Sequence, residues 1–140
     1  MKFRLLLLAL LLSFGSGCAA EVAQVSPAEA AQRVAAGSAV LVDVREPAEW
    51  AETGVAAPAV LLSKGEFDAD LTGGWKPFLQ KHRDRPIILY CHSGRRSGLV
   101  AAVLAKQGYT VANAGGFKDW KEAGLPVRNM MQPAGDTKSR

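Results

Sequence analysis

The fold of this chain can be inferred outward from Ile87-Ile88-Leu89-Tyr90-Cys91-His92-Ser93-Gly94-Arg95-Arg96. The first four residues form a short apolar, β-prone run, which predicts a buried strand. Residues 97–107 are rich in Ala and Leu and are followed by a glycine, which predicts a helix with a C-terminal glycine stop. Cys91 is therefore expected where a strand ends and a helix begins, among backbone N–H groups at the positive end of the helix.

This position favours the ionised form of the Cys91 thiol. The helix N-terminus, Arg95 and Arg96 place positive charge near the sulfur, and the thiolate is the nucleophilic form of cysteine. Gly94 is expected to allow the sharp turn by adopting a positive φ. The alternative is a small, buried and inert cysteine, but an arginine-containing turn after a strand favours chemistry.

The rest of the chain alternates apolar runs with helix patterns. Strands are predicted at 22–25, 39–44, 59–62 and 110–113, and helices at 27–36, 47–52, 75–82 and 117–123, whereas 63–74 is polar and predicted to be irregular. This order predicts an α/β domain with a mostly parallel central sheet of about five strands, flanked by helices on both faces. Ligands of such sheets bind at the carboxyl ends of the strands, where Cys91 is placed.

The N-terminus predicts export. Residues 1–17 combine a basic start, an apolar stretch too short to span a bilayer well, and small residues typical of a cleavage site. Gly15-Ser16-Gly17-Cys18 resembles a lipobox, in which Cys18 would be lipidated and would anchor the domain to a membrane. The other interpretation is ordinary cleavage after Ala20. Either way, the predicted location is the bacterial periplasm, in solution or membrane-anchored as a lipoprotein.

The folded domain is predicted to span residues 22–128. Residues 129–140 have no apolar period and are predicted to be a disordered C-terminal tail.

Charge and composition exclude several classes of function. The chain has 17 Lys and Arg against 13 Asp and Glu, and loss of Lys2 and Arg4 with the leader reduces the net charge to about +2. The basic residues are scattered without interleaved aromatics, which argues against nucleic-acid binding. If Cys18 is lipidated, Cys91 is the only free thiol of the mature chain and has no disulfide partner. Two histidines and one thiol are too few ligands for a metal site.

With these features in place, the chain resembles the rhodanese domain family in its small, exported, single-domain form. The resemblance covers residues 22–127, and four segments carry it in the family's order. These are Asp43-Val44-Arg45 with Glu49-Trp50, the segment 54–63, Tyr90 to Ser97, and Gly115-Gly116-Phe117 through Trp120 to Ala123-Gly124-Leu125-Pro126-Val127. One departure is Val55-Ala56-Ala57-Pro58, where the family usually has a histidine-containing turn.

The resemblance implies a sulfurtransferase without a cofactor. Cys91 would take a sulfane sulfur from thiosulfate or a related anionic donor as a persulfide, and would pass it to cyanide or a thiol. The implied substrate-binding residues are His92, Ser93, Gly94, Arg95, Arg96 and Ser97. Which arginine faces the pocket stays open, as does whether His92 tunes the thiolate or points into solvent.

Two other functions remain under consideration. One is a non-catalytic carrier of sulfane sulfur, or a module that binds a partner. The other is phosphatase or arsenate reductase chemistry, in which five residues separate the cysteine from an arginine. Here four residues separate Cys91 from Arg96, which predicts a smaller anion cradle.

Asp43, Arg45 and Glu49 are predicted to give structural support rather than acid–base catalysis. Arg45 precedes Glu49 by four residues, and we expect the two to form an ion pair that braces the loop after the second strand. Trp50, Trp75 and Trp120 are expected in the core or at the pocket rim, with Trp75 the candidate for the pocket mouth.

Overall fold

The computed structural model describes residues 22–130. The predicted signal at 1–17, the candidate lipidation site Cys18 and most of the predicted tail, residues 131–140, lie outside the described part of the chain.

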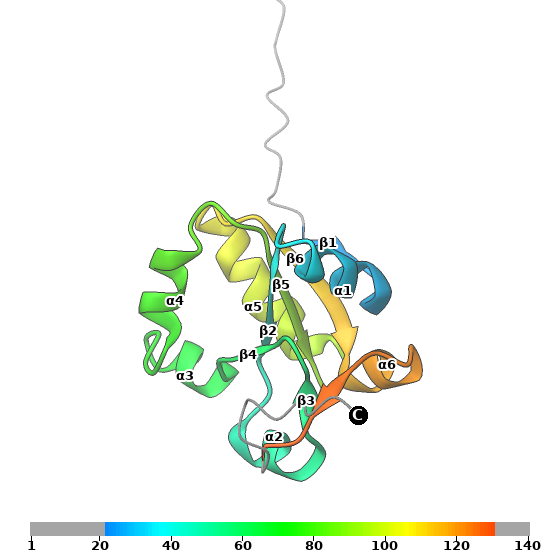
Figure 1. The fold of residues 1–140 in the computed structure, drawn as a ribbon. Helices are drawn as coiled ribbons and strands as arrows, with labels where there is room; N and C mark the ends of the chain where they lie inside the picture. Colours follow the sequence, from blue (N-terminus) through cyan, green and yellow to red (C-terminus); the bar gives the residue numbers. More distant parts are fainter. Residues whose placement is uncertain (1–21, 131–140) are drawn as a thin grey trace, which may run out of the picture.

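The described residues form an α/β fold around a five-stranded sheet (Figure 1). All its neighbouring strands are parallel. The strand order is β1 (Ala23–Gln24), β6 (Val111–Gly116), β5 (Ile87–Cys91), β2 (Val40–Asp43) and β4 (Val60–Leu61). This confirms the predicted fold class and places β5, the strand that ends at Cys91, at the centre of the sheet.

Helices cover both faces of the sheet. α1 (Pro27–Ala35) and α6 (Phe117–Glu122) lie on one face, and α3 (Lys64–Asp68), α4 (Trp75–Lys81) and α5 (Arg95–Lys106) lie on the other (Figure 1). α2 (Pro47–Thr53) follows β2 at the carboxyl end of the sheet, beside the strands β3 (Val55–Ala56) and β7 (Val127–Arg128).

The alternation of side chains along β5 divides the core into two layers. Ile87, Leu89 and Cys91 point into the layer beneath α3, α4 and α5, whereas Ile88 and Tyr90 point into the layer beneath α1 and α6. All five residues are buried, as expected for a parallel strand covered on both faces. The Cys91 side chain is thereby directed towards α5.

The segment 63–74, predicted to be irregular, contains the short helix α3. The Ser63 hydroxyl caps the helix by accepting a hydrogen bond from the Glu66 N–H at 3.2 Å. Phe67 of α3 packs edge-on against Trp75, with ring centroids 4.9 Å apart. α3 is too short to show an apolar period in the sequence. Burial of the Phe67 ring against Trp75 stabilises it instead.

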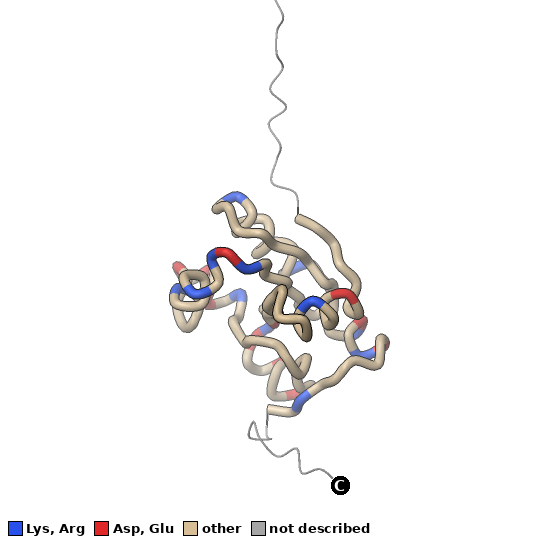
Figure 2. The backbone as a smooth tube through the Cα atoms, turned by 45° about the horizontal axis from the view of Figure 1, so that its top comes forward, with Lys and Arg blue, Asp and Glu red and all other residues tan. Residues whose placement is uncertain are grey.

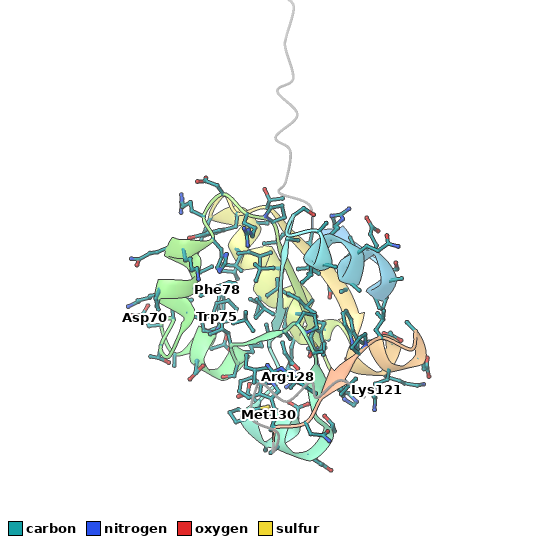
Figure 3. All side chains as sticks on the ribbon, viewed as in Figure 1. Asp70, Trp75, Phe78, Lys121, Arg128 and Met130 are labelled. Atoms are coloured by element: carbon teal, nitrogen blue, oxygen red, sulfur yellow. The ribbon has the colours of Figure 1, made fainter. Side chains whose placement is uncertain are left out.

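Trp75 does not lie at a pocket mouth. Its side chain is fully buried, and its indole N–H donates to the Ser63 carbonyl at 2.8 Å. Figure 3 shows Trp75 and Phe78 pointing inward from α4. The expectation that Trp75 marks the pocket mouth is therefore wrong, because α3 covers it.

The two-residue strands β3 and β7 were not predicted. They pair antiparallel, with Val55 opposite Arg128 and Ala56 opposite Val127. The Arg128 guanidinium also donates to the carbonyls of Ala57 and Ala59, at 3.1 and 2.9 Å. These contacts attach the end of the domain to the segment that departs from the family's usual turn.

Charged residues are interspersed over the described chain, with acidic positions between the basic ones (Figure 2). Within residues 22–130, no helix has the length and apolar character needed to cross a membrane.

Candidate active site

Cys91 ends β5, and the loop that follows folds back over its sulfur. Gly94 has φ 88°, as predicted, and this left-handed conformation turns the chain into the first residue of α5. The Gly94 N–H donates to Cys91 Sγ at 3.0 Å, and the Ser97 hydroxyl lies 3.4 Å from the same sulfur. The loop thus brings hydrogen-bond donors from two residues onto one thiol.

These donors determine the acidity of the thiol. Burial by itself raises the pKa of Cys91, but the Ser97 hydroxyl and the backbone N–H groups of Ser97, Ser93 and Gly94 outweigh it, so that the pKa lies below its ordinary value. The Cys91 residue is fully buried. The site therefore combines a buried sulfur with a surrounding set of amide donors that favours the thiolate.

The other loop residues differ in exposure. His92, Ser93 and Arg95 are exposed, whereas Arg96 is half-buried. Arg96 turns towards α2 and binds the Glu49 carboxylate through two hydrogen bonds of 2.7 Å. The charge of the Cys91 thiolate is among the causes that raise the pKa of Arg96, after its hydrogen bond to Glu49.

The predicted ion pair between Arg45 and Glu49 is wrong. Arg45 lies before α2 begins, so the spacing of four residues does not place the two side chains on one helical face. The Arg45 guanidinium instead turns back to Asp43, with Nη2 to Oδ2 at 2.7 Å. Glu49 instead forms its ion pair with Arg96, which follows the cysteine loop.

Asp43 and Arg45 form a buried network that connects four elements. Both residues are almost fully buried, and the Tyr90 hydroxyl donates to Asp43 Oδ2 at 2.5 Å. Arg45 also donates to the Gly54 carbonyl at 2.8 Å and stacks over the Phe117 ring at 4.2 Å. This network joins the ends of β2 and β5 to α2 and α6, and it faces away from the sulfur.

One polar residue at the site was not predicted. Asn113 lies within β6 and is 6% exposed, with Oδ1 2.8 Å from the Ser97 Oγ and 3.1 Å from the Gly115 nitrogen. Its Nδ2 donates to the Gly94 carbonyl at 2.8 Å. A polar side chain inside an apolar strand, two residues before a Gly-Gly pair, was the available signal.

A bulge in β6 brings this strand close to the loop. Leu89 pairs with Asn113 but Cys91 pairs with Gly116, so β6 holds one more residue than β5 between these pairs. Gly115 has φ 81° in the bulge, and a Cβ on Gly116 would lie 2.4 Å from the His92 carbonyl oxygen. The two glycines therefore belong to the strand and let the loop backbone pack directly against it.

No group of three or more His, Cys, Asp or Glu side chains within residues 22–130 is arranged to hold a metal ion.

The fold and the site place this chain among α/β proteins that carry a cysteine loop between the central strand of a parallel sheet and a helix. The rhodanese-like domain model matches residues 26–123, and the chain belongs to this family. It is 31% identical over 108 residues to a thiosulfate sulfurtransferase, GlpE, of Actinobacillus succinogenes, covering 74% of this chain and 88% of the relative. It is 36% identical over 90 residues to a sulfurtransferase of Allochromatium vinosum, covering 63% of this chain and 77% of the relative.

Solved structures agree with the fold. A protein from Rhodopseudomonas palustris, described as of unknown function and a possible tyrosine phosphatase, is 27% identical, with a TM-score of 0.64 over 76% of this chain and 85% of that one. A polysulfide-sulfur transferase from Wolinella succinogenes shares the fold at 24% identity, with a TM-score of 0.62 over 82% and 84% of the two chains. The family match and the names of the relatives from Actinobacillus succinogenes and Allochromatium vinosum support sulfurtransferase activity at the level of the family.

Proposed function

We propose that this protein is a thiosulfate sulfurtransferase that works through a persulfide on Cys91. The observation that carries the proposal is the convergence of the Gly94 N–H and the Ser97 hydroxyl on a thiol whose pKa is lowered. A lowered pKa increases the fraction of Cys91 present as thiolate, which is the nucleophilic form of cysteine. The names of the relatives from Actinobacillus succinogenes and Allochromatium vinosum support the same reaction class.

The reaction has two steps. In the first, the Cys91 thiolate attacks the outer sulfur of thiosulfate, an S–S bond forms to Sγ, and sulfite leaves with the electrons of the bond that breaks. In the second, cyanide or a thiolate attacks the outer sulfur of the persulfide, and the Cys91 thiolate leaves. Both steps exchange one bond for another, so the reaction needs neither a cofactor nor an external oxidant.

The loop supplies the binding energy for anions. Backbone N–H groups between His92 and Ser97 at the start of α5 can bind the oxygens of thiosulfate and the leaving sulfite. Arg95 and Arg96 add positive charge, and the contact with Glu49 keeps Arg96 close to the loop. Because Cys91 is fully buried, the outer sulfur of the donor has to enter between the exposed residues of the loop.

Mass spectrometry tests the intermediate directly. After incubation with thiosulfate and removal of excess donor, the peptide that contains Cys91 should carry one additional sulfur atom. Cyanide should then remove that atom and release thiocyanate. The Cys91→Ser variant is the control, and sulfur transfer at the wild-type rate by this variant would rule out the persulfide mechanism.

Steady-state assays separate the alternatives. A carrier would form the persulfide but would not turn over with thiosulfate and cyanide, and a module that only binds a partner would do neither. A phosphatase or arsenate reductase would instead hydrolyse a simple phosphate ester or reduce arsenate. The spacing of four residues between Cys91 and Arg96 favours the smaller cradle and hence sulfur transfer.

We also propose that the domain acts after export, in the bacterial periplasm. Residues 1–17 carry the proposed signal, and lipidation of Cys18 would add a membrane anchor. The intact mass of the mature protein separates the two routes, because a lipoprotein begins at an acylated Cys18 and a soluble product begins after Ala20.

A further inference from the structure

We propose that Asn113 is a positioning residue for the sulfur-transfer reaction, whose side-chain amide holds the Gly94 N–H on the Cys91 sulfur and keeps the Ser97 hydroxyl beside that sulfur. This inference rests on the proposed function. Asn113 does not contact the Cys91 sulfur; it contacts Gly94 and Ser97, the residues that lie against that sulfur.

The orientation of the Asn113 amide follows from its partners. The Gly115 N–H can only donate and therefore faces Oδ1, at 3.1 Å, whereas the Gly94 carbonyl can only accept and therefore faces Nδ2, at 2.8 Å. Oδ1 has no hydrogen, so the Ser97 hydroxyl at 2.8 Å donates to it. One amide thus connects the β6 bulge, the turn at Gly94 and the first turn of α5.

The contact with Gly94 places the donor nearest to the sulfur. The Gly94 carbonyl accepts from Asn113 Nδ2 and from the Gly98 N–H, the latter at 3.1 Å. These bonds hold the left-handed Gly94, whose own N–H then points at Cys91 Sγ from 3.0 Å. Without the Asn113 amide, the Gly94 carbonyl would lose its hydrogen bond to β6, and the Gly94 peptide would be free to turn away from the sulfur.

The contact with Ser97 keeps a second donor beside the sulfur. A serine hydroxyl in a helix readily bonds to a backbone carbonyl three or four residues earlier in the chain. Asn113 Oδ1 accepts the hydroxyl instead and leaves the Ser97 oxygen 3.4 Å from Cys91 Sγ. When the thiol ionises, the hydroxyl can turn its hydrogen to the sulfur, because Oδ1 still accepts from the Gly115 N–H. A hydrogen bond to an ion is stronger than one between neutral groups, which favours this turn.

The test compares Asn113→Leu with Gln24→Leu. Gln24 pairs with Asn113 in the neighbouring strand and is exposed, so it offers a matched amide-to-leucine change away from the sulfur. The readout is the rate of Cys91 alkylation by iodoacetamide as a function of pH, with circular dichroism as the check on folding. The charged groups near the loop, Arg96 with Glu49, and Asp119 at the Gly116 N–H, are unchanged in both variants.

In Asn113→Leu we expect the alkylation profile to move to higher pH. The rate below the thiol pKa should fall about three- to tenfold, which is less than the loss of a whole hydrogen bond to a charged group, because the variant displaces the Gly94 and Ser97 donors without removing them. The limiting rate at high pH should not change, and Gln24→Leu should match the wild type. A folded Asn113→Leu protein with the wild-type profile, or with a profile at lower pH, would overturn the proposal.

A second variant covers the case in which Asn113→Leu does not fold. A Cβ on Gly98 would lie 3.3 Å from Asn113 Nδ2, and alanine is preferred to glycine inside a helix. Gly98→Ala should therefore keep the fold, displace the amide slightly and move the profile in the same direction by a smaller amount. If Asn113→Leu does not fold, an unchanged profile in Gly98→Ala refutes the inference. Alkylation needs no sulfur donor, so a wild-type protein without transferase activity would count against the proposed function alone.

Discussion

The Arg96 guanidinium on α5 binds the Glu49 carboxylate on α2 through two parallel hydrogen bonds, Nη1 to Oε2 and Nη2 to Oε1, each 2.7 Å long. Glu49 also accepts the Glu46 N–H at 2.9 Å, which fixes the first turn of α2. The pair therefore joins the helix that follows the cysteine loop to the helix that follows β2, although the two residues lie far apart in the sequence.

We predict that this pair makes stability depend on pH. The hydrogen bond from Arg96 is the main cause that lowers the pKa of Glu49, from 4.5 to about 2. Because the folded pKa is the lower one, the stabilisation is present above pH 4.5 and is lost as the pH falls towards 2. Both side chains are 30% exposed, so the full shift overstates the energy and we expect about 1–2 kcal/mol.

Urea unfolding between pH 2 and pH 7, compared for the wild type and Glu49→Gln, measures this difference. The two free energies of unfolding should converge at the acid end. Glu52→Gln, an exposed change on the same helix, is the control. A gap between wild type and Glu49→Gln that stays constant over the whole range would contradict the assignment.

For Arg96→Ala we predict weaker binding of the anionic donor and slower transfer. The variant removes a positive charge that interacts with the Cys91 thiolate and leaves Glu49 without its partner. The KM for thiosulfate should rise several-fold, by about 1 kcal/mol or more. Arg96→Lys keeps the charge but not the two-point contact, so it should recover only part of the loss.

Arg95→Ala is the matched comparison, because Arg95 is the neighbouring arginine and is exposed. Its KM should rise less than that of Arg96→Ala. Steady-state kinetics at several thiosulfate concentrations decide between them, and a larger effect at Arg95 would show that the exposed arginine is the one that binds the donor.

The sequence predicted most of the sheet and of the cysteine loop. The apolar runs that became β2 and β5 are long enough to show their pattern, and the turn at Gly94 follows from the sequence between strand and helix. β3 and β7 escaped prediction because, unlike the equally short β1 and β4, they do not lie in an apolar or alternating run that indicates a strand. Their pairing depends on tertiary contacts such as those of Arg128 with the segment 57–59.

Ion-pair partners were harder to predict than elements. A spacing of four residues predicts a contact only when both residues are helical, and Arg45 lies before α2. The true partner of Glu49 is Arg96, which the topology brings into place. Asn113 was overlooked for a similar reason, since its three contacts come from the loop, the bulge and α5.

We predict that Asp43→Ala strongly destabilises the fold. It removes the carboxylate that neutralises Arg45 and accepts the Tyr90 hydroxyl, and it leaves a guanidinium that is 1% exposed without its charge partner. The expected loss is about 3–5 kcal/mol of unfolding free energy. Urea denaturation measures it, and Asp84→Ala, at an exposed aspartate, should change stability by less than about 0.5 kcal/mol. A loss below about 1 kcal/mol at Asp43 would mean that Arg45 finds another partner.

We predict that Gly116→Ala damages the active-site loop through a steric contact alone. Gly116 has φ −104°, which any residue can adopt, but a Cβ there would lie 2.4 Å from the His92 carbonyl oxygen. Because the obstacle is backbone, the loop must move away from β6, and we expect a loss of about 1–3 kcal/mol in stability together with slower alkylation of Cys91. Gly65→Ala is the control, since its Cβ meets only the flexible end of the Glu46 side chain, at 3.0 Å. Thermal unfolding and iodoacetamide kinetics on both variants measure these effects, and a Gly116→Ala protein with wild-type values in both would show that the loop does not depend on its close packing against β6.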